Sequence, residues 1–140
     1  MSRTVYLSGP ITSTLDCHTW RQKFSAALEK IGVASLDPTR RPPFTSKSPT
    51  SEWSRELVEA DLKDIDLSDL LVVNLQGLGT YKAWGTICEL AHAYYLDIPA
   101  IVVVDPGMAH PFVDTYATHK TTCLDVALDM ALEHYGTQGA

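Results

Sequence analysis

The sequence has few cysteines, and none of them are spaced for a metal site or a disulfide framework. Three occur in 140 residues, Cys17, Cys88 and Cys123, and no two form a CxxC pair. An odd number of widely separated thiols argues against a disulfide-stapled secreted domain and against a zinc site. Free thiols are typical of a reducing compartment, and no apolar signal segment follows Met1, so we expect a cytoplasmic protein.

Long apolar runs, an excess of basic residues and the common phosphate-binding motifs are also missing. No run approaches the roughly 20 residues that a membrane span needs. With 17 acidic and 11 basic residues, the formal net charge is -6, which disfavours a nucleic-acid or anionic membrane partner. Neither GxGxxG nor GxxxxGK[ST] occurs, so the dinucleotide and P-loop signatures are absent.

What the chain does contain is an alternation of apolar, β-branched stretches with amphipathic ones. Hydrophobic residues make up 45% of it, enough for a core, and its length fits one domain over residues 1–140. The patterns predict strands at 4–9, 33–36, 70–75 and 100–105, a short fifth strand within 120–124, and helices at 16–31, 51–66, 86–96 and 124–135. This order predicts a doubly wound α/β fold, with a mainly parallel sheet of four to five strands flanked by helices.

Capping and packing residues refine these boundaries. Asp16 is a candidate N-cap for the first helix, and Thr50 or Ser51 for the second. Trp20 and Trp53 fall at helical spacing, so we expect both in the core. The segment 37–50 contains four prolines, and we interpret it as a loop whose few basic residues do not form a polyanion site.

The polar and small residues that follow the strands are candidates for a binding site. Ligands of parallel sheets bind at the carboxyl ends of the strands. The candidates at these positions are Ser8, Gly9, Pro10, Asp37, Asn74, Gly85 and His110. Several of them have a structural interpretation as well, since Asp37 precedes a proline, Asn74 could cap its strand, and His110 could belong to a surface turn.

Glu89, in the segment GTICELAH, is the most informative single residue. A carboxylate near a helix N-terminus is favoured by the helix dipole and can simply be exposed. Its apolar neighbours Ile87 and Leu90 favour instead a buried acid, which is costly unless it is paired or used in chemistry. The neighbouring Cys88 is expected to be a small, buried packing residue. The residues alone leave both interpretations of Glu89 open.

Four segments together resemble a known family. They are VYLSGPIT, DLKDIDLSDLLVVNLQG, GTICELAHAYYLDIPAIVVV and HPFVDTYATHKTTCLDVALDMAL. In this combination the chain resembles the nucleoside 2-deoxyribosyltransferases, and most closely their short bacterial and phage branch. The resemblance covers nearly the whole chain except residues 40–50.

The resemblance implies a flavodoxin-like fold, a homodimer or higher homo-oligomer, and exchange of the base of a 2′-deoxyribonucleoside through a covalent deoxyribosyl-enzyme. Glu89 matches the family nucleophile, Tyr6 the tyrosine that orients it, and Asp61 the base-side aspartate, eight residues before Asp69. A second base-side aspartate of some members corresponds here to Ala83. The partners implied are a nucleoside or nucleotide and a free base, and neither a metal nor an organic cofactor is needed.

Two other functions stay open at this point. One is hydrolysis of the N-glycosidic bond of nucleosides or their 5′-monophosphates, with candidate phosphate donors at Ser8, Thr12, Ser13, Lys82 and Thr86. The other is a non-catalytic nucleotide-binding module. The joint presence of the three catalytic candidates argues against a pocket without activity. The sequence ranks neither purines against pyrimidines nor deoxyribose against ribose.

Overall fold

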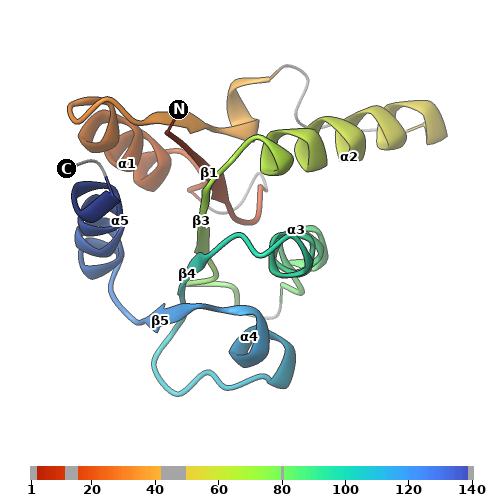
Figure 1. The fold of residues 1–140 in the computed structure, drawn as a ribbon. Helices are drawn as coiled ribbons and strands as arrows, with labels where there is room; N and C mark the ends of the chain where they lie inside the picture. The colour runs from red at the N-terminus through yellow and green to blue at the C-terminus, as the bar shows by residue number, and fades with distance from the viewer. Residues whose placement is uncertain (1–2, 12–15, 42–49, 80, 139–140) are drawn as a thin grey trace.

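Five parallel strands form the centre of the computed structural model, which describes residues 3–11, 16–41, 50–79 and 81–138 (Figure 1). They are β1 (Thr4–Ser8), β2 (Ala34–Leu36), β3 (Leu70–Asn74), β4 (Ala100–Val103) and β5 (His119–Thr121). Their order in the sheet is β2-β1-β3-β4-β5, and every neighbouring pair is parallel. This is the flavodoxin-like order, so the predicted fold class is confirmed.

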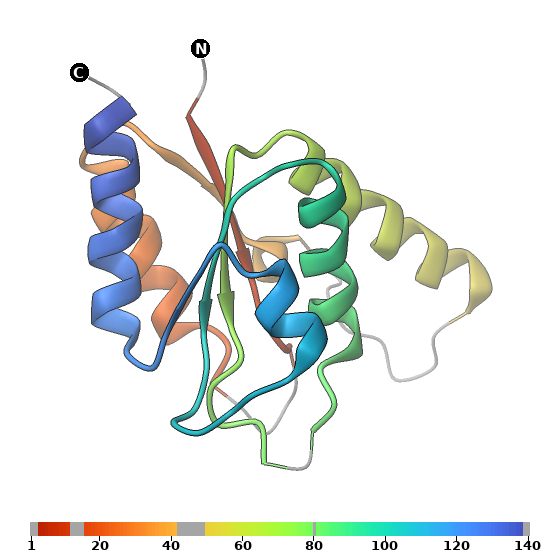
Figure 2. The same cartoon turned by 60° about the horizontal axis from the view of Figure 1, so that its bottom comes forward.

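Helices cover both faces of the sheet (Figures 1 and 2). One face carries α1 (Thr19–Glu29) and α5 (Leu124–Gln138), and the other carries α2 (Ser51–Asp66), α3 (Trp84–Tyr95) and α4 (Pro111–Tyr116). Successive side chains of a strand point to opposite faces. On β1, Val5 and Leu7 therefore pack toward α1 and α5, whereas Tyr6 packs with residues of α3.

Two helix starts and one additional helix refine the predictions. Thr50 is the N-cap of α2, and its hydroxyl accepts a hydrogen bond from the backbone N–H of Trp53 at 3.1 Å. The prediction of Asp16 as an N-cap is wrong, because α1 begins later and Asp16 accepts from the backbone N–H groups of His18 and Thr19 instead. The helix α4 and the 3-10 turn η1 (Pro38–Arg40) were not predicted, and both are too short to show a periodic pattern.

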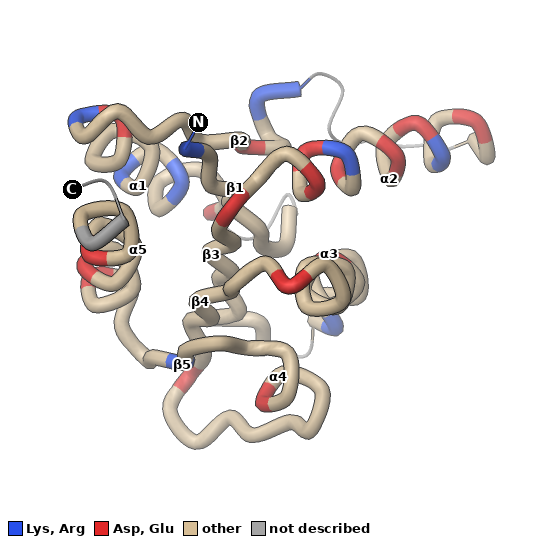
Figure 3. The backbone as a smooth tube through the Cα atoms, viewed as in Figure 1, with Lys and Arg blue, Asp and Glu red and all other residues tan. Residues whose placement is uncertain are grey.

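The N-terminal half of α2 extends beyond the sheet, as Figure 1 shows at its right. Trp20 is buried as predicted, but Trp53 is only half-buried, and Val58 is 53% exposed. The prediction that Trp53 lies in the core is thus wrong, because the helix has left the sheet at that point. Acidic and basic residues are interleaved along this helix (Figure 3). Within the described ranges no helix is long and apolar enough to cross a membrane.

Candidate functional site

A cavity of about 580 Å³ lies at the carboxyl end of β1, between α2 and α3. This is within the usual range for small-molecule sites. Its polar lining includes the carboxyl groups of Asp61 and Glu89, and its apolar lining includes Trp53, Leu57 and Tyr81. The cavity therefore has two acidic side chains and a hydrophobic wall, at the edge where parallel sheets bind ligands.

Glu89 receives one hydrogen bond on each carboxylate oxygen. The hydroxyl of Tyr6 donates to Oε2 at 2.6 Å, and the hydroxyl of Ser8 donates to Oε1 at 2.7 Å. Tyr6 and Ser8 are two residues apart on β1, so their side chains leave the same face of the strand. A carboxylate has about four lone-pair positions, so each oxygen keeps one that can face the cavity.

The surroundings of Glu89 hold its pKa well above the ordinary value. Burial, chiefly, together with the charge of Asp61, raises the pKa of Glu89 to about 7, against the hydrogen bonds from Tyr6 and Ser8 and the charge of Arg21. Burial and the neighbouring carboxylates also raise the pKa of Tyr6, so this phenol remains a neutral donor. Glu89 can therefore be ionised near neutral pH while staying much less solvated than a surface acid.

Asp61 approaches the cavity from α2 and is held by an arginine. The guanidinium of Arg41 bonds its Oδ1 and also lies 3.3 Å from Oδ2 of Asp64. Burial raises the pKa of Asp61, and the ion pair with Arg41 opposes this shift. These opposing effects suit a carboxyl group that exchanges a proton with a ligand.

Three of the predicted small residues line the cavity, namely Gly9, Pro10 and Gly85. At Gly9 a Cβ atom would lie 3.1 Å from the carbonyl oxygen of Asn74 and 3.3 Å from the Trp20 ring, so a side chain there would fit only if these neighbours moved slightly. The Asn74 side chain accepts from the backbone N–H of Gln76 at 3.0 Å, which is the capping role that its position at a strand end suggests.

Asp37 and His110 lie outside the cavity lining. Asp37 is buried at the end of β2, where its carboxylate accepts from the backbone N–H of Thr39 at 2.9 Å. His110 caps α4, and its Nδ1 accepts from the backbone N–H of Phe112 at 3.2 Å. It lines a neighbouring cavity of about 530 Å³ together with other side chains. Neither residue is brought to Glu89 in this structure.

The remaining candidates are divided between the two cavities. Thr86 lines the first cavity and Lys82 the second, while Thr12 and Ser13 lie outside the described residues. Ala83 borders both cavities and precedes α3 with a left-handed φ of 52°. In the described parts of the chain, no three His, Cys, Asp or Glu side chains gather to ligate a metal.

Sequence reasoning missed two features of this site. Arg41 belongs to the stretch that we interpreted as a plain loop, and only the folded chain brings it to Asp61. Ser8 as a ligand contact stays a prediction, and the structure adds that its hydroxyl donates to Glu89, which its two-residue spacing from Tyr6 could have indicated. Cys88 is exposed, so the prediction of a buried packing thiol is wrong.

Comparisons with known proteins bear on the family and the fold. The sequence profile of a family described as nucleoside 2-deoxyribosyltransferase like matches residues 2–108. A solved 2-deoxyribosyltransferase from Bacillus psychrosaccharolyticus is 16% identical with a TM-score of 0.73, covering 90% of this chain and 90% of that one. A comparison with curated proteins gave no match.

Two further solved structures share the fold. A conserved protein from Enterococcus faecalis is 18% identical with a TM-score of 0.61, covering 93% of this chain and 88% of its own. A CMP N-glycosidase from Clostridium botulinum is 14% identical with a TM-score of 0.53, covering 92% and 98%. At these identities the structural likeness establishes the fold and not the reaction.

Proposed function

The chain belongs to the nucleoside 2-deoxyribosyltransferase-like family, and we propose that it exchanges the base of 2′-deoxyribonucleosides through a covalent deoxyribosyl–glutamate intermediate. The observation that carries the proposal is the carboxylate of Glu89, which faces a nucleoside-sized cavity and accepts a hydroxyl hydrogen bond on each oxygen. Such an arrangement aligns a nucleophile and leaves a lone pair free for attack.

In the first step, a Glu89 carboxylate oxygen forms a bond to C1′ as the C1′–N bond to the base breaks. The leaving base takes the electron pair of that bond and receives a proton from Asp61, whose pKa is raised by burial. While one bond breaks and the other forms, the sugar resembles an oxocarbenium ion, and the negative carboxylate of Glu89 stabilises its positive charge. The products are a deoxyribosyl ester of Glu89 and a free base.

In the second step, a nitrogen of another base attacks C1′ and returns the electron pair of the ester bond to Glu89. The incoming base gives up its proton to Asp61, which restores both carboxyl groups to their starting states. Two displacements at C1′ retain the anomeric configuration. Neither step calls for a metal or an organic cofactor.

The apolar part of the cavity lining suits a planar base. Trp53, Leu57 and Tyr81 belong to this lining, and such side chains favour contact with a flat aromatic ligand. The proposed orientation therefore places the base between α2 and Tyr81, with the sugar over Glu89.

A second candidate function is hydrolysis of the N-glycosidic bond, in nucleosides or their 5′-monophosphates. The residue at the second base-side position is Ala83, which cannot hold or protonate an incoming base. Water needs no such residue, so this position favours hydrolysis relative to members with two aspartates. The CMP N-glycosidase with the same fold is consistent with this alternative.

A base-exchange assay separates these functions. The protein is incubated with deoxyinosine and free adenine, and then with the corresponding 5′-monophosphate, and the products are separated by chromatography. The transferase proposal predicts deoxyadenosine, formed by the wild type and not by Glu89→Ala. Glu59→Ala, at an exposed position of α2, serves as a matched control that keeps activity.

The other outcomes are equally specific. Free hypoxanthine without deoxyadenosine would identify a hydrolase, and its dependence on the phosphate would identify the substrate. Absence of turnover with every nucleoside and nucleotide would refute both reactions and leave a nucleotide-binding module.

A further inference from the structure

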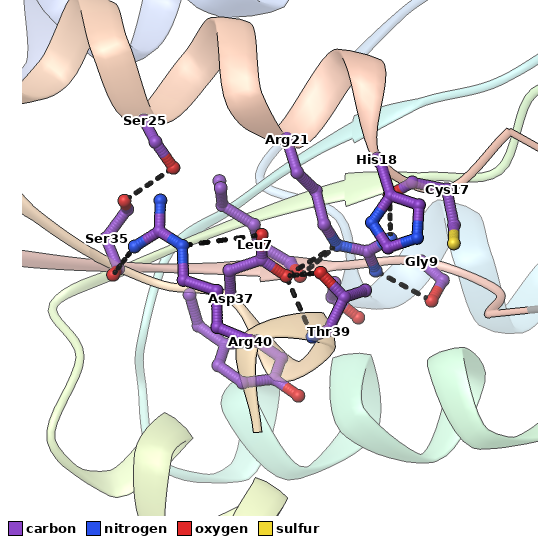
Figure 4. Close-up of polar contacts among 12 residues, drawn as sticks. Leu7, Gly9, Cys17, His18, Arg21, Ser25, Ser35, Asp37, Thr39 and Arg40 are labelled. Carbon is purple, nitrogen blue, oxygen red and sulfur yellow. Dashed lines mark hydrogen bonds and ion pairs between the residues drawn. The ribbon is translucent and has the colours of Figure 1, made fainter. Parts of the chain in front are cut away.

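Arg21 of α1 is fully buried, yet it does not line the cavity described above. Its Nε donates to the carbonyl of Leu7 at 3.2 Å, its Nη2 to that of Gly9 at 2.9 Å, and its Nη1 to that of Cys17 at 2.6 Å (Figure 4). Leu7 and Gly9 flank Ser8 in the chain. The guanidinium thus holds the backbone carbonyls of the residues before and after Ser8, from the sheet face opposite α3.

Asp37 secures the guanidinium from the end of β2. Its Oδ1 lies 3.6 Å from Nε of Arg21 and accepts from the Thr39 hydroxyl at 2.6 Å (Figure 4). Arg40 lies 3.8 Å from the other oxygen, and the Trp20 ring lies 4.9 Å from the Arg21 guanidinium carbon. A buried guanidinium requires such partners, because a charge removed from water is costly when unpaired. These contacts tie the ends of β1 and β2 together.

The charge of Arg21 also acts on the candidate nucleophile. The groups that act on the charge of Glu89 are Tyr6 and Ser8 of β1, Asp61 of α2 and, from the opposite face of the sheet, Arg21 of α1. Burial, chiefly, and the charge of Asp61 raise the pKa of Glu89, whereas the two hydroxyl groups and the guanidinium lower it. Arg21 and Ser8 therefore favour the same, ionised form of the carboxyl group.

We propose that Arg21 is a positioning residue of the glycosyl-transfer site: by holding the backbone carbonyls on both sides of Ser8, it keeps that hydroxyl on Glu89. The inference rests on the proposed function, because it assigns Arg21 a part in the reaction of Glu89. Arginine suits the role, since its planar fork donates in several fixed directions. A lysine would keep the charge but could not hold both carbonyls in this geometry.

Arg3 offers a matched control at the amino ends of the strands. Its Nη1 and Nη2 donate to the carbonyls of Ile31 at 3.3 Å and Tyr135 at 2.9 Å, and its guanidinium carbon lies 5.3 Å from the centre of the Tyr135 ring. Arg3→Lys therefore removes a similar set of backbone and ring contacts without touching the β1 end that carries Ser8.

The test is a double-mutant cycle on base exchange, with Arg21→Lys, Ser8→Ala and the double variant. We expect Arg21→Lys to lower kcat roughly 10-fold in the wild-type background but less than about 2-fold in the Ser8→Ala background, with KM nearly constant. Arg3→Lys should leave kcat within about 2-fold of wild type. Equal losses in both backgrounds, or an equal loss in Arg3→Lys, would overturn the proposal.

A second measurement does not depend on turnover. The carboxyl carbon of Glu89 is followed by NMR as a function of pH in ¹³C-glutamate-labelled protein, and Glu89→Gln assigns the signal. The titration midpoint should rise in Arg21→Lys and in Ser8→Ala, rise no further in the double variant, and stay constant in Arg3→Lys. An unchanged midpoint in Arg21→Lys would refute the positioning role, even where the wild type exchanges no base and the proposed function itself has failed.

Arg21→Lys could also fail to fold. Asp37→Asn then takes its place in the kinetic cycle, since it removes the carboxylate beside the guanidinium and leaves Arg21 in the chain. A kcat loss that shrinks in the Ser8→Ala background supports the proposal, and a loss that is independent of Ser8 refutes it.

Discussion

Replacing Glu89 by glutamine should make the protein more stable at alkaline pH, although it removes the proposed nucleophile. Burial raises the pKa of Glu89 from the ordinary 4.5 to about 7, so the folded protein holds this proton to higher pH than the unfolded chain does. Between these two values the folded state binds more protons, and its free energy of unfolding falls as the pH rises. Glutamine cannot ionise, so the variant escapes this loss.

The size of the effect follows from proton linkage. With these two values, the contribution of Glu89 to stability decreases by about 2 kcal/mol between about pH 5.5 and pH 8.5. Glu89 keeps part of its surface open to the cavity, so solvent reduces the cost of its charge. We therefore expect the stability of Glu89→Gln, relative to wild type, to rise by about 1–2 kcal/mol across this range.

Urea denaturation of both proteins at several pH values measures this difference, and groups that titrate alike in the two proteins cancel. Any rearranged hydrogen bond to the new amide adds a constant offset, so the slope with pH is the quantity to compare. Glu59→Gln, at an exposed position, should give a flat difference. A flat difference for Glu89→Gln, or one that decreases with pH, would refute the assignment of Glu89 as a desolvated acid.

Three further predictions test other contacts. Tyr6→Phe removes the 2.6 Å hydrogen bond that favours ionised Glu89, so the pKa of Glu89 should rise and the rate at about pH 6 should fall roughly 10-fold, with a much smaller loss at about pH 9. Arg41→Met removes the positive charge that lowers the pKa of Asp61, so Asp61 should stay protonated to higher pH and the rate above about pH 7 should rise; an unchanged pH–rate profile would exclude Asp61 as the proton donor. Asp97→Gly, at an exposed position with φ 58° after α3, should raise the free energy of unfolding by about 0.5–1 kcal/mol in urea, with a smaller gain for Asp97→Asn.

The sheet could be predicted from the sequence because its central strands are buried on both faces. Uninterrupted apolar runs such as LLVV, at residues 70–73, are typical of buried strands in a domain of this size, and Gly or Pro occurs in the segments between them. The boundaries of α1 and the existence of α4 were less accessible. A helix as short as α4 shows less than two turns of periodicity, and its start depends on Pro111 and the His110 cap rather than on a hydrophobic pattern.

Two residues of the candidate site could be named before the fold was known, and their roles in a reaction stay predictions. Tyr6 and Glu89 follow from the family resemblance, and the structure joins them through a hydrogen bond. The roles of Arg21 and Arg41 could not be read in the same way, because each depends on partners from another part of the fold. An arginine in an amphipathic helix or a proline-rich loop resembles many exposed arginines until its carboxylate and carbonyl partners are known.

Glu89 itself shows why helix position alone does not decide the state of an acid. Its place early in a helix suggested stabilisation of the charge by the N-terminal dipole. In the structure α3 begins at Trp84, so Glu89 lies in its second turn, where the dipole effect has largely decayed. Burial then dominates and raises the pKa of Glu89. The hydroxyl groups of Tyr6 and Ser8 on β1, and not the helix dipole, stabilise its negative charge. The ionised form of Glu89 that the proposed reaction needs is thus stabilised mainly by β1 and by Arg21, which holds the end of that strand. Substitutions on β1 should therefore alter the pH dependence of the reaction more than substitutions at the start of α3.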